Sequence, residues 1–291
     1  MERPILSSPQ NPQLRRVRRW LEKPRQCRTD GVFLADGIHL VQEAIAAGLL
    51  CRDLFVDSDR TAAGKDSSAS DEITAIVELA SSRAVPVHLV LPSLFRAISP
   101  VETPQGVLGV FDRPERRERG PAKRTSGGDT TLEEGAGDTR SGHIMVAAGV
   151  QDPANLGSMI RSARATGIRE LLSTRGTVDP YHHRALRASM GATFRLRVQP
   201  ELGLDELLEE LSRSGRRTLA LSSHRGIPLS SLDPDEPSAI VFGSEGHGLP
   251  PELEAALDLH VRIPMEPGVE SLAVPAAAAV AFYWLYLRNG L

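Results

Sequence analysis

The C-terminal half of the chain alternates short apolar runs with longer amphipathic segments. Short apolar runs are typical of buried strands, whereas apolar residues spaced three and four apart indicate helices. The pattern predicts strands at 144–150, 171–173, 194–198, 218–222, 239–242 and 260–263, and helices at 155–166, 181–190, 204–212 and 272–287. Strands that alternate with helices predict a parallel sheet covered on both faces, and ligands bind such a sheet at the carboxyl ends of its strands.

The N-terminal part shows the same alternation on a smaller scale. Its pattern predicts strands at 32–34, 53–56 and 87–90, and helices at 38–47 and around 73–81. These elements indicate a small α/β domain. The polar stretch at 57–71 is expected to be a surface loop within that domain.

Between these two parts, the sequence becomes rich in Gly, Ser, Thr and charged residues and contains almost no apolar side chain. Such a segment cannot bury enough apolar surface to offset its loss of conformational entropy, so a flexible linker is expected. The prediction is an N-terminal domain at 1–112, a linker at 113–142 and a C-terminal domain at 143–291. A chain of 291 residues is long enough for two domains with cores of their own.

Composition excludes several classes of protein. Hydrophobic residues make up 41% of the chain and charged residues 24%, which is typical of folded globular proteins. The two cysteines, Cys27 and Cys51, lack the spacing of metal ligands, and we expect no metal site. Because the sequence shows neither a membrane-spanning run nor a signal peptide, a reducing, cytoplasmic location is expected.

The net charge of -3 conceals a local excess of positive charge at the N-terminus. Residues 1–30 contain three acidic side chains against eight cationic ones, which are Arg3, Arg15, Arg16, Arg18, Arg19, Lys23, Arg25 and Arg28. Such a segment can attract a phosphate backbone. A solvated helix face explains the same pattern equally well.

The first candidate for chemistry is the segment 151–164, which follows a predicted buried strand and opens a helix. Asp152 is suited to cap that helix and Pro153 to its first turn. Asn155 and Arg161 fall outside the apolar stripe of the helix, near the carboxyl end of the strand. Spacing alone also permits an ordinary turn residue and a surface charge.

Two further segments follow predicted strands in the same way. At 243–249, three glycines surround Glu245, and glycine permits close approach of the backbone to a ligand. At 261–274, Ile263, Met265 and Leu272 could enclose an adenine ring. Each segment taken alone is equally compatible with a plain turn or with core packing.

In this order, the three segments resemble the three motifs of the SpoU/TrmH branch of the SPOUT methyltransferases. The likeness consists of D-P-x-N-L-G-x-x-x-R-x-A from Asp152, G-S-E-G-x-G from Gly243, and I-P-M from Ile263 with S-L at 271–272. It covers residues from about 144 to 288. In the N-terminal part, residues 11–12, 31–34, 37 and 103–108 resemble the family's RNA-binding domain, which has a ribosomal-protein-like α/β fold.

The resemblance implies a deep trefoil knot in the C-terminal sheet and a homodimer whose active site draws on both subunits. Phe282, Trp284 and Leu285 of the last helix are then candidates for the dimer interface. The residues implied to hold S-adenosylmethionine are Gly243, Gly246, Ile263, Met265 and Leu272. Those implied to face the ribose are Asn155, Arg161, Glu245 and Ser271. The implied reaction methylates a ribose 2′-hydroxyl of structured RNA, with large-subunit rRNA favoured over tRNA.

Two positions depart from the family pattern. Ala273 stands where the family usually has Asn, and Asp36 stands where Glu is commoner before Gly37. The loss of an amide side chain at 273 leaves open a second hypothesis, in which the protein is a catalytically weak or inactive family member that acts as an RNA-binding or assembly factor. Retention of Asn155, Arg161, Glu245 and Ser271 favours the enzyme.

Overall fold

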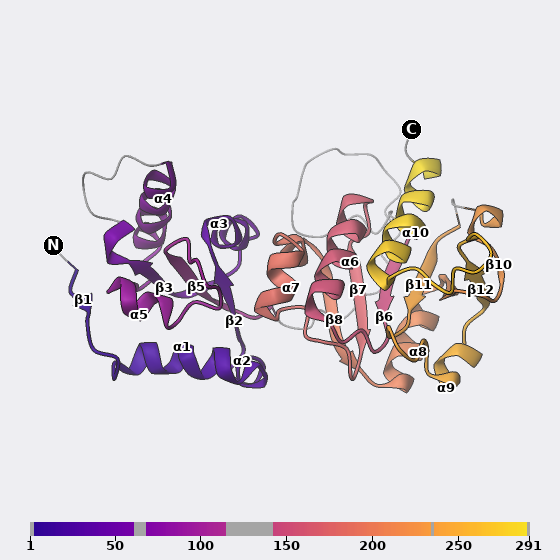
Figure 1. Ribbon diagram of the computed structural model, residues 1–291, viewed down its shortest axis with the longest axis horizontal. Helices are drawn as coiled ribbons and strands as arrows, with labels where there is room; N and C mark the ends of the chain where they lie inside the picture. The colour runs from indigo at the N-terminus through magenta and orange to yellow at the C-terminus, as the bar shows by residue number, and fades with distance from the viewer. Residues whose placement is uncertain (1–2, 61–67, 115–141, 234–235, 290–291) are drawn as a thin grey trace. The chain divides into compact units, whose positions relative to one another are not determined.

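The computed structural model describes residues 3–60, 68–114, 142–233 and 236–289 (Figure 1). The chain divides into two compact units, one formed by Met1–Pro114 with Tyr181–Phe194 and the other by Glu115–Pro180 with Arg195–Leu291. Nearly all of the predicted linker lies outside the described residues. Of the loop predicted at 57–71, Ser58–Arg60 forms a short 3₁₀ turn and residues from Ser68 onward are helical, while 61–67 are not described.

The second unit is built on a seven-stranded sheet in which every pair of neighbouring strands is parallel, in the order β10-β12-β9-β11-β6-β7-β8. The strands are β6 (Ile144–Ala147), β7 (Glu170–Thr174), β8 (Arg197–Leu202), β9 (Arg217–Ser222), β10 (Ile227–Pro228), β11 (Ser238–Phe242) and β12 (Leu259–Arg262). The predicted α/β fold with a parallel sheet is thus confirmed.

Helices cover both faces of this sheet (Figure 1). On one face α6 (Pro153–Ala165) packs against α10 (Val274–Asn289), and the other face carries α8 (Leu204–Ser214) and α9 (Pro251–Ala255). Adjacent residues of β11 point to opposite faces. Val241 joins the apolar cluster of α8 and α9, whereas the Phe242 ring meets Phe282 of α10 edge-on, with centroids 5.3 Å apart.

Several predicted boundaries were wrong because a local turn ends the element. The strand expected at 144–150 stops at Ala147, since Gly149 adopts a φ of +81°. The strand expected at 194–198 begins only at Arg197, because Ala192–Arg195 forms a 3₁₀ turn. The helix expected at 181–190 is reduced to α7 (His183–Ala188), which belongs to the first unit.

The first unit contains a five-stranded mixed sheet in the order β1-β4-β3-β5-β2. Its strands are β1 (Ile5–Leu6), β2 (Val32–Asp36), β3 (Cys51–Asp57), β4 (Val87–Val90) and β5 (Val107–Asp112). Its remaining helices are α1 (Pro12–Glu22), α2 (Pro24–Thr29), α3 (Ile38–Ala46), α4 (Ser68–Ser82) and α5 (Pro92–Arg96). The strand β5 was not predicted, although it pairs antiparallel with both β2 and β3.

The two faces of this sheet are covered by different helices. Leu14 and Val17 of α1 and Phe95 of α5 join one apolar cluster with Leu34 and Phe55 of the sheet. The helices α3 and α4 pack together and contact strands of the same sheet. Within the described residues, no helix combines the length and apolar character that a membrane crossing requires.

Asp36 is a carboxylate almost fully enclosed at the end of β2. It is only 7% exposed, and the Ser99 hydroxyl donates a hydrogen bond to its Oδ1 over 3.1 Å. Burial raises the pKa of Asp36 to about 6, although the Ser99 hydrogen bond and the charge of Arg187 act in the opposite direction. The side chain therefore takes up a proton more readily in the folded state than in the unfolded chain, where an aspartate has a pKa near 3.9.

This raised pKa predicts a loss of stability as the pH rises. Since the folded state binds the proton more tightly, the contribution of Asp36 is fully present below about pH 4 and disappears as the pH passes about 6, with an upper limit of about 3 kcal/mol. We expect Asp36→Asn to remove this dependence. Denaturant unfolding measured between pH 4 and 7.5 should then show that the free energy of unfolding of the variant rises relative to that of the wild type as the pH increases. A constant difference across that range would contradict the assignment.

Candidate active site

The candidate functional loops gather at one edge of the parallel sheet. The strands β6, β11, β9 and β12 are neighbours and run in the same direction, so the loops that follow them leave from the same edge. Ala147 of β6 and Phe242 of β11 are partners in register, and each is the last residue of its strand. The segments after these two strands, which contain the first two motifs, therefore begin side by side.

The structure brings together Asn155 and Glu245. The Asn155 side-chain amide donates a hydrogen bond to Glu245 Oε1 over 2.8 Å, although the residues are 90 positions apart. Asn155 lies in the first turn of α6, which Asp152 caps by accepting a hydrogen bond from the Ala154 amide over 2.7 Å. The predicted cap and Pro153 at the start of this helix are confirmed.

Glu245 is held at the tip of a small closed loop. The backbone amides of Ser244 and Gly248 each donate to the carbonyl of the other, over 3.0 and 3.1 Å, and the His247 amide donates to Ser244 Oγ. A Cβ atom at Gly243 would lie 2.3 Å from the carbonyl carbon of Gly248. The loop's own backbone therefore requires glycine at 243, and the expected contact of Gly243 with a cofactor stays a prediction.

Thr177 is a residue of this region that sequence analysis missed. Its hydroxyl accepts a hydrogen bond from the Gly149 amide over 2.9 Å and donates one to the Ala147 carbonyl over 3.0 Å. The Val178 amide also donates to the Val150 carbonyl over 2.8 Å. The turn after β7 thus fixes the loop between β6 and α6. No pattern in a single sequence identifies such a contact, because a threonine in a turn is common.

Arg161 and Ser271 are not brought to the Asn155–Glu245 pair. Arg161 is exposed on α6, about 9 Å further along the helix axis than Asn155, because six residues separate the two. Ser271 is exposed before α10. Neither side chain makes a hydrogen bond or ion pair with any residue in the described part of the chain.

The apolar residues expected to hold a cofactor occupy the loop between β12 and α10. Ile263 and Met265 are half-buried, whereas Leu272 is 37% exposed. Gly246, also expected to contact the cofactor, is exposed at the tip of the Glu245 loop, and nothing lies within 4 Å of where its Cβ would be. Leu272 is thus an apolar side chain that no other part of the described chain buries at this edge of the sheet.

A further loop at the same edge was not recognised in the sequence. Because β9 lies between β12 and β11, the segment Ser223–Gly226 after β9 emerges between the two loops expected to hold the cofactor. Gly226 has a φ of +99°, and a Cβ there would overlap the carbonyl of His260. Arg262 Nε donates to the Gly226 carbonyl over 3.2 Å. This loop is therefore fastened to β12.

Ala273 occupies the N-cap position of α10. Its carbonyl accepts the hydrogen bond of the Ala277 amide over 3.0 Å, and the helix begins at the next residue. Alanine has no side-chain acceptor for the free amides of the first turn, while asparagine is among the preferred residues at this position. The departure from the family pattern thus has a structural consequence, which is an uncapped helix next to the candidate site.

We expect Ala273→Asn to stabilise the protein by about 1 kcal/mol, because the new side chain can accept a hydrogen bond from the Ala276 amide. Chemical denaturation of the two proteins measures the difference, and Ala273→Leu, which adds bulk without an acceptor, is the matched control. Equal stability of the Asn and Leu variants would exclude the capping role.

Comparison with known proteins identifies both halves of the chain. Residues 142–283 match the SpoU rRNA Methylase family, and residues 11–109 match the MRM3-like substrate binding domain. The chain is 26% identical to the 23S rRNA (guanosine(2553)-2′-O)-methyltransferase RlmP of Bacillus subtilis, over 93% of this chain and 95% of that protein.

Solved structures of similar fold cover almost the whole chain. A putative RNA methyltransferase of the TrmH family from Porphyromonas gingivalis is 27% identical, with a TM-score of 0.73 over 98% of this chain and 100% of the other. An AdoMet-bound rRNA methyltransferase from Sinorhizobium meliloti has a TM-score of 0.78 at 20% identity, over 99% of each chain, and shows the same fold.

Together the sheet, the paired motif residues and these matches define an RNA methyltransferase. The chain belongs to the SpoU/TrmH family of these enzymes, as the motifs indicated.

Proposed function

We propose that this protein transfers the methyl group of S-adenosylmethionine to a ribose 2′-hydroxyl of structured RNA. The observation that carries the proposal is the contact between Asn155 and Glu245 at the carboxyl edge of the parallel sheet, where a substrate of this fold is expected. The full-length similarity to an enzyme named for 2′-O-methylation of 23S rRNA supports the ribose as acceptor and large-subunit rRNA as substrate. The proposed location of the reaction is the cytoplasm.

The residues at this edge fit such a cofactor. S-adenosylmethionine has an apolar adenine ring and polar ribose and amino-acid parts. The exposed Leu272, with Ile263 and Met265 nearby in sequence, offers apolar surface for a ring, while the loop at Gly243 to Gly248 offers backbone groups and open space. The Ser223–Gly226 loop between them is a further candidate for contact.

When bound, the cofactor supplies an electrophilic methyl group on a sulfonium whose leaving thioether is neutral. The task of the protein is therefore mainly to position the ribose oxygen and to exclude water. Asn155 orients the Glu245 carboxylate, which can accept a hydrogen bond from a ribose hydroxyl. The planar, cationic guanidinium of Arg161 acts as a clamp for phosphate and ribose and favours loss of the hydroxyl proton.

We further propose that the loops of the second unit form a trefoil knot. After β9 the chain forms β10, the outermost strand of the sheet, and then returns to form β11 on the other side of β9. It then crosses β9 a second time to form β12, which lies between β9 and β10. This repeated crossing of one strand supports an interlocked path. The knot would hold the cofactor loops together without a disulfide.

The same proposal assigns a different task to each domain. The domain at 143–291 contains the methyl-transfer site, and the domain at 1–112 binds the RNA substrate, in agreement with its match to a substrate binding domain. The segment 113–142 connects them.

We also propose a homodimer formed through α10. Phe282 and Leu285, which were expected at the interface, are 1% and 2% exposed and belong to the core of their own chain. The exposed large apolar side chains in the described part of α10 are instead Val280, Tyr283, Tyr286 and Leu287. Several of them border an open apolar cavity of about 340 Å³, whose lining comprises Leu229, Ser230, Ile263, Pro264, Val280, Tyr283, Trp284 and Leu287. A second copy would cover this surface.

The central test separates cofactor binding from methyl transfer. Gly243→Ala should displace the Glu245 loop and weaken S-adenosylmethionine binding by roughly tenfold or more, since the added Cβ would overlap the Gly248 backbone. Arg161→Ala should keep cofactor affinity within a few-fold while transfer falls by roughly 10²-fold. Calorimetry measures binding, and single-turnover labelling of rRNA measures transfer.

Arg213→Ala is the control, because Arg213 forms its ion pairs with Glu209 and Glu210 of α8. The product is digested to nucleosides, and methylation on a base with none on the ribose would overturn the ribose assignment. Normal transfer by Arg161→Ala would exclude Arg161 from the site.

Mixing the two variants tests whether the site is shared between subunits. If Arg161 of one subunit serves the cofactor loop of the other, a heterodimer of Arg161→Ala and Gly243→Ala has one intact site. An equal mixture should then recover about a quarter of wild-type activity after subunit exchange. Light scattering checks the dimer, and a monomeric mass or the absence of any recovery would contradict a shared site.

A further inference from the structure

The helices α1 and α2 form a strongly cationic segment on a protein of negative net charge. From Asn11 to Thr29 the chain has seven cationic side chains and a single acidic one, Glu22. The buried residues of α1 are Leu14, Val17 and Trp20, so one face of the helix is fixed against the sheet. The cationic side chains on the opposite face and in the turn that follows are Arg15, Arg19, Lys23 and Arg25, all exposed, and we call them the basic ridge; the exposed Glu22 lies among them.

This arrangement of charge opposes the preferences of an isolated helix. Acidic residues stabilise the first turn of a helix, yet the first turn of α1 has none, and Arg15 and Arg16 follow directly. Arg15 and Arg19 are four residues apart on the exposed side, a spacing at which like charges destabilise a helix by a few tenths of a kcal/mol. An external polyanion would convert this local cost into a favourable interaction.

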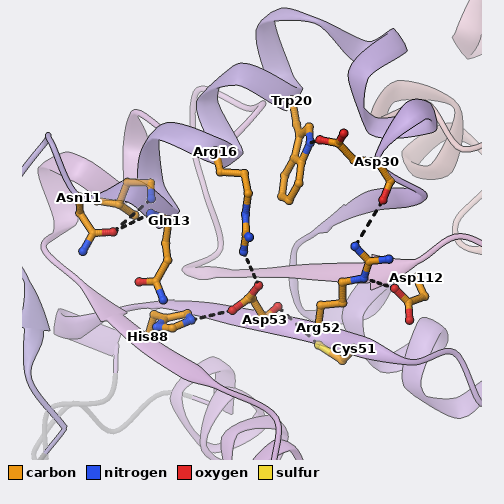
Figure 2. A network of polar contacts seen from close by, with 11 residues as sticks. Asn11, Gln13, Arg16, Trp20, Asp30, Cys51, Arg52, Asp53, His88 and Asp112 are labelled. Atoms are coloured by element: carbon orange, nitrogen blue, oxygen red, sulfur yellow. Dashed lines mark hydrogen bonds and ion pairs between the residues drawn. The ribbon is translucent and has the colours of Figure 1, made fainter.

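The ridge is held rigidly from below (Figure 2). Arg16, beside the ridge, donates to Asp53 Oδ2 over 2.9 Å, and His88 contacts Asp53 Oδ1 over 2.8 Å. The Trp20 indole donates to Asp30 Oδ2 over 2.7 Å, and the Asp30 carbonyl accepts from Arg52, which also pairs with Asp112. These contacts fasten the middle and the C-terminal end of α1 to the domain beneath it, so the ridge is organised before any ligand binds.

The charges of the ridge are largely available to a partner. The side chains of Arg15, Lys23 and Arg25 make no hydrogen bond or ion pair with any residue in the described ranges, and the Arg19 side chain has only a long contact of 3.4 Å to Asp30. Asp53 and Asp30 are instead used beneath the ridge, by Arg16 and Trp20, which leaves Glu22 as the acidic side chain of α1 beside the ridge. The ridge therefore offers several guanidinium and ammonium donors that point outward.

We propose that the basic ridge binds the phosphate backbone of the RNA substrate. This inference rests on the proposed function and specifies which surface of the N-terminal domain meets the RNA. Cations spaced along a fixed helix recognise phosphates without reading base sequence, so the ridge supplies affinity and orientation, and the choice of nucleotide is made elsewhere.

The test is the affinity of the full-length protein for a fluorescein-labelled RNA hairpin, measured by anisotropy over a series of KCl concentrations. The double variant Arg15→Gln, Arg19→Gln should bind roughly tenfold or more weakly, and the slope of log affinity against log salt should fall by about one for each lost contact. Arg15→Lys, Arg19→Lys keeps the charges and should keep the slope. Arg83→Gln, an exposed site beyond the end of α4, is the matched control.

If the Gln variant has the same RNA affinity and salt slope as the wild type, the basic ridge does not bind the RNA backbone. This conclusion would hold even if the wild type methylates rRNA as proposed. If the Gln variant still binds RNA normally but no longer binds phosphatidylglycerol vesicles, the partner of the ridge is a membrane surface, and the inference fails. If the wild type binds no RNA, both this inference and the proposed function fail. A melting temperature that is equal to or slightly above that of the wild type, and an unchanged S-adenosylmethionine affinity, show that the variants are folded.

Discussion

The candidate site depends on the parallel pairing of β6 with β11. Because Ala147 and Phe242 are register partners and both end their strands, two segments far apart in the sequence leave the sheet side by side. The hydrogen bond between Asn155 and Glu245 is a consequence of this register. A slip by one residue would turn every side chain of β11 to the opposite face, which buried partners on both sides prevent. Core packing thereby fixes the geometry of the polar pair.

Sequence patterns predicted most strands of the C-terminal unit because its central strands β6 and β11 are nearly continuous apolar runs, as expected in a sheet buried on both faces, whereas the two-residue strand β10 was missed. They failed where a contact distant in sequence decides the structure. The strand β5 has the apolar pattern of a strand, with Gly109 inside it, yet it escaped prediction because its pairing with β2 and β3 is not visible locally. Boundaries at Gly149 and near Phe194 shifted because short turns interrupt a favourable pattern.

For the site, the sequence located all three functional segments but did not determine their contacts. Asn155 and Glu245 meet, as a shared site requires, whereas Arg161 lies six positions further along α6 and makes no hydrogen bond or ion pair within the described residues. Gly243 is expected to contact the cofactor, and the structure adds a second requirement for glycine there, which is the close backbone of Gly248. The role of Thr177 could not be predicted from the sequence. It depends on the hydrogen bond that its hydroxyl accepts from the Gly149 amide, which joins the loops after the neighbouring strands β6 and β7.

The ring contact between Phe242 and Phe282 has a consequence for the recognition of related proteins. Phe242 ends the strand that leads into the Glu245 loop, and Phe282 lies in the second half of the last helix, beyond all three motifs. A chain shortened after Leu272 would retain every motif residue and would pass a search based on motifs alone. It would nevertheless lack the aromatic side chain that packs against the base of the loop, so functional assignment within such a family needs the helix as well as the motifs.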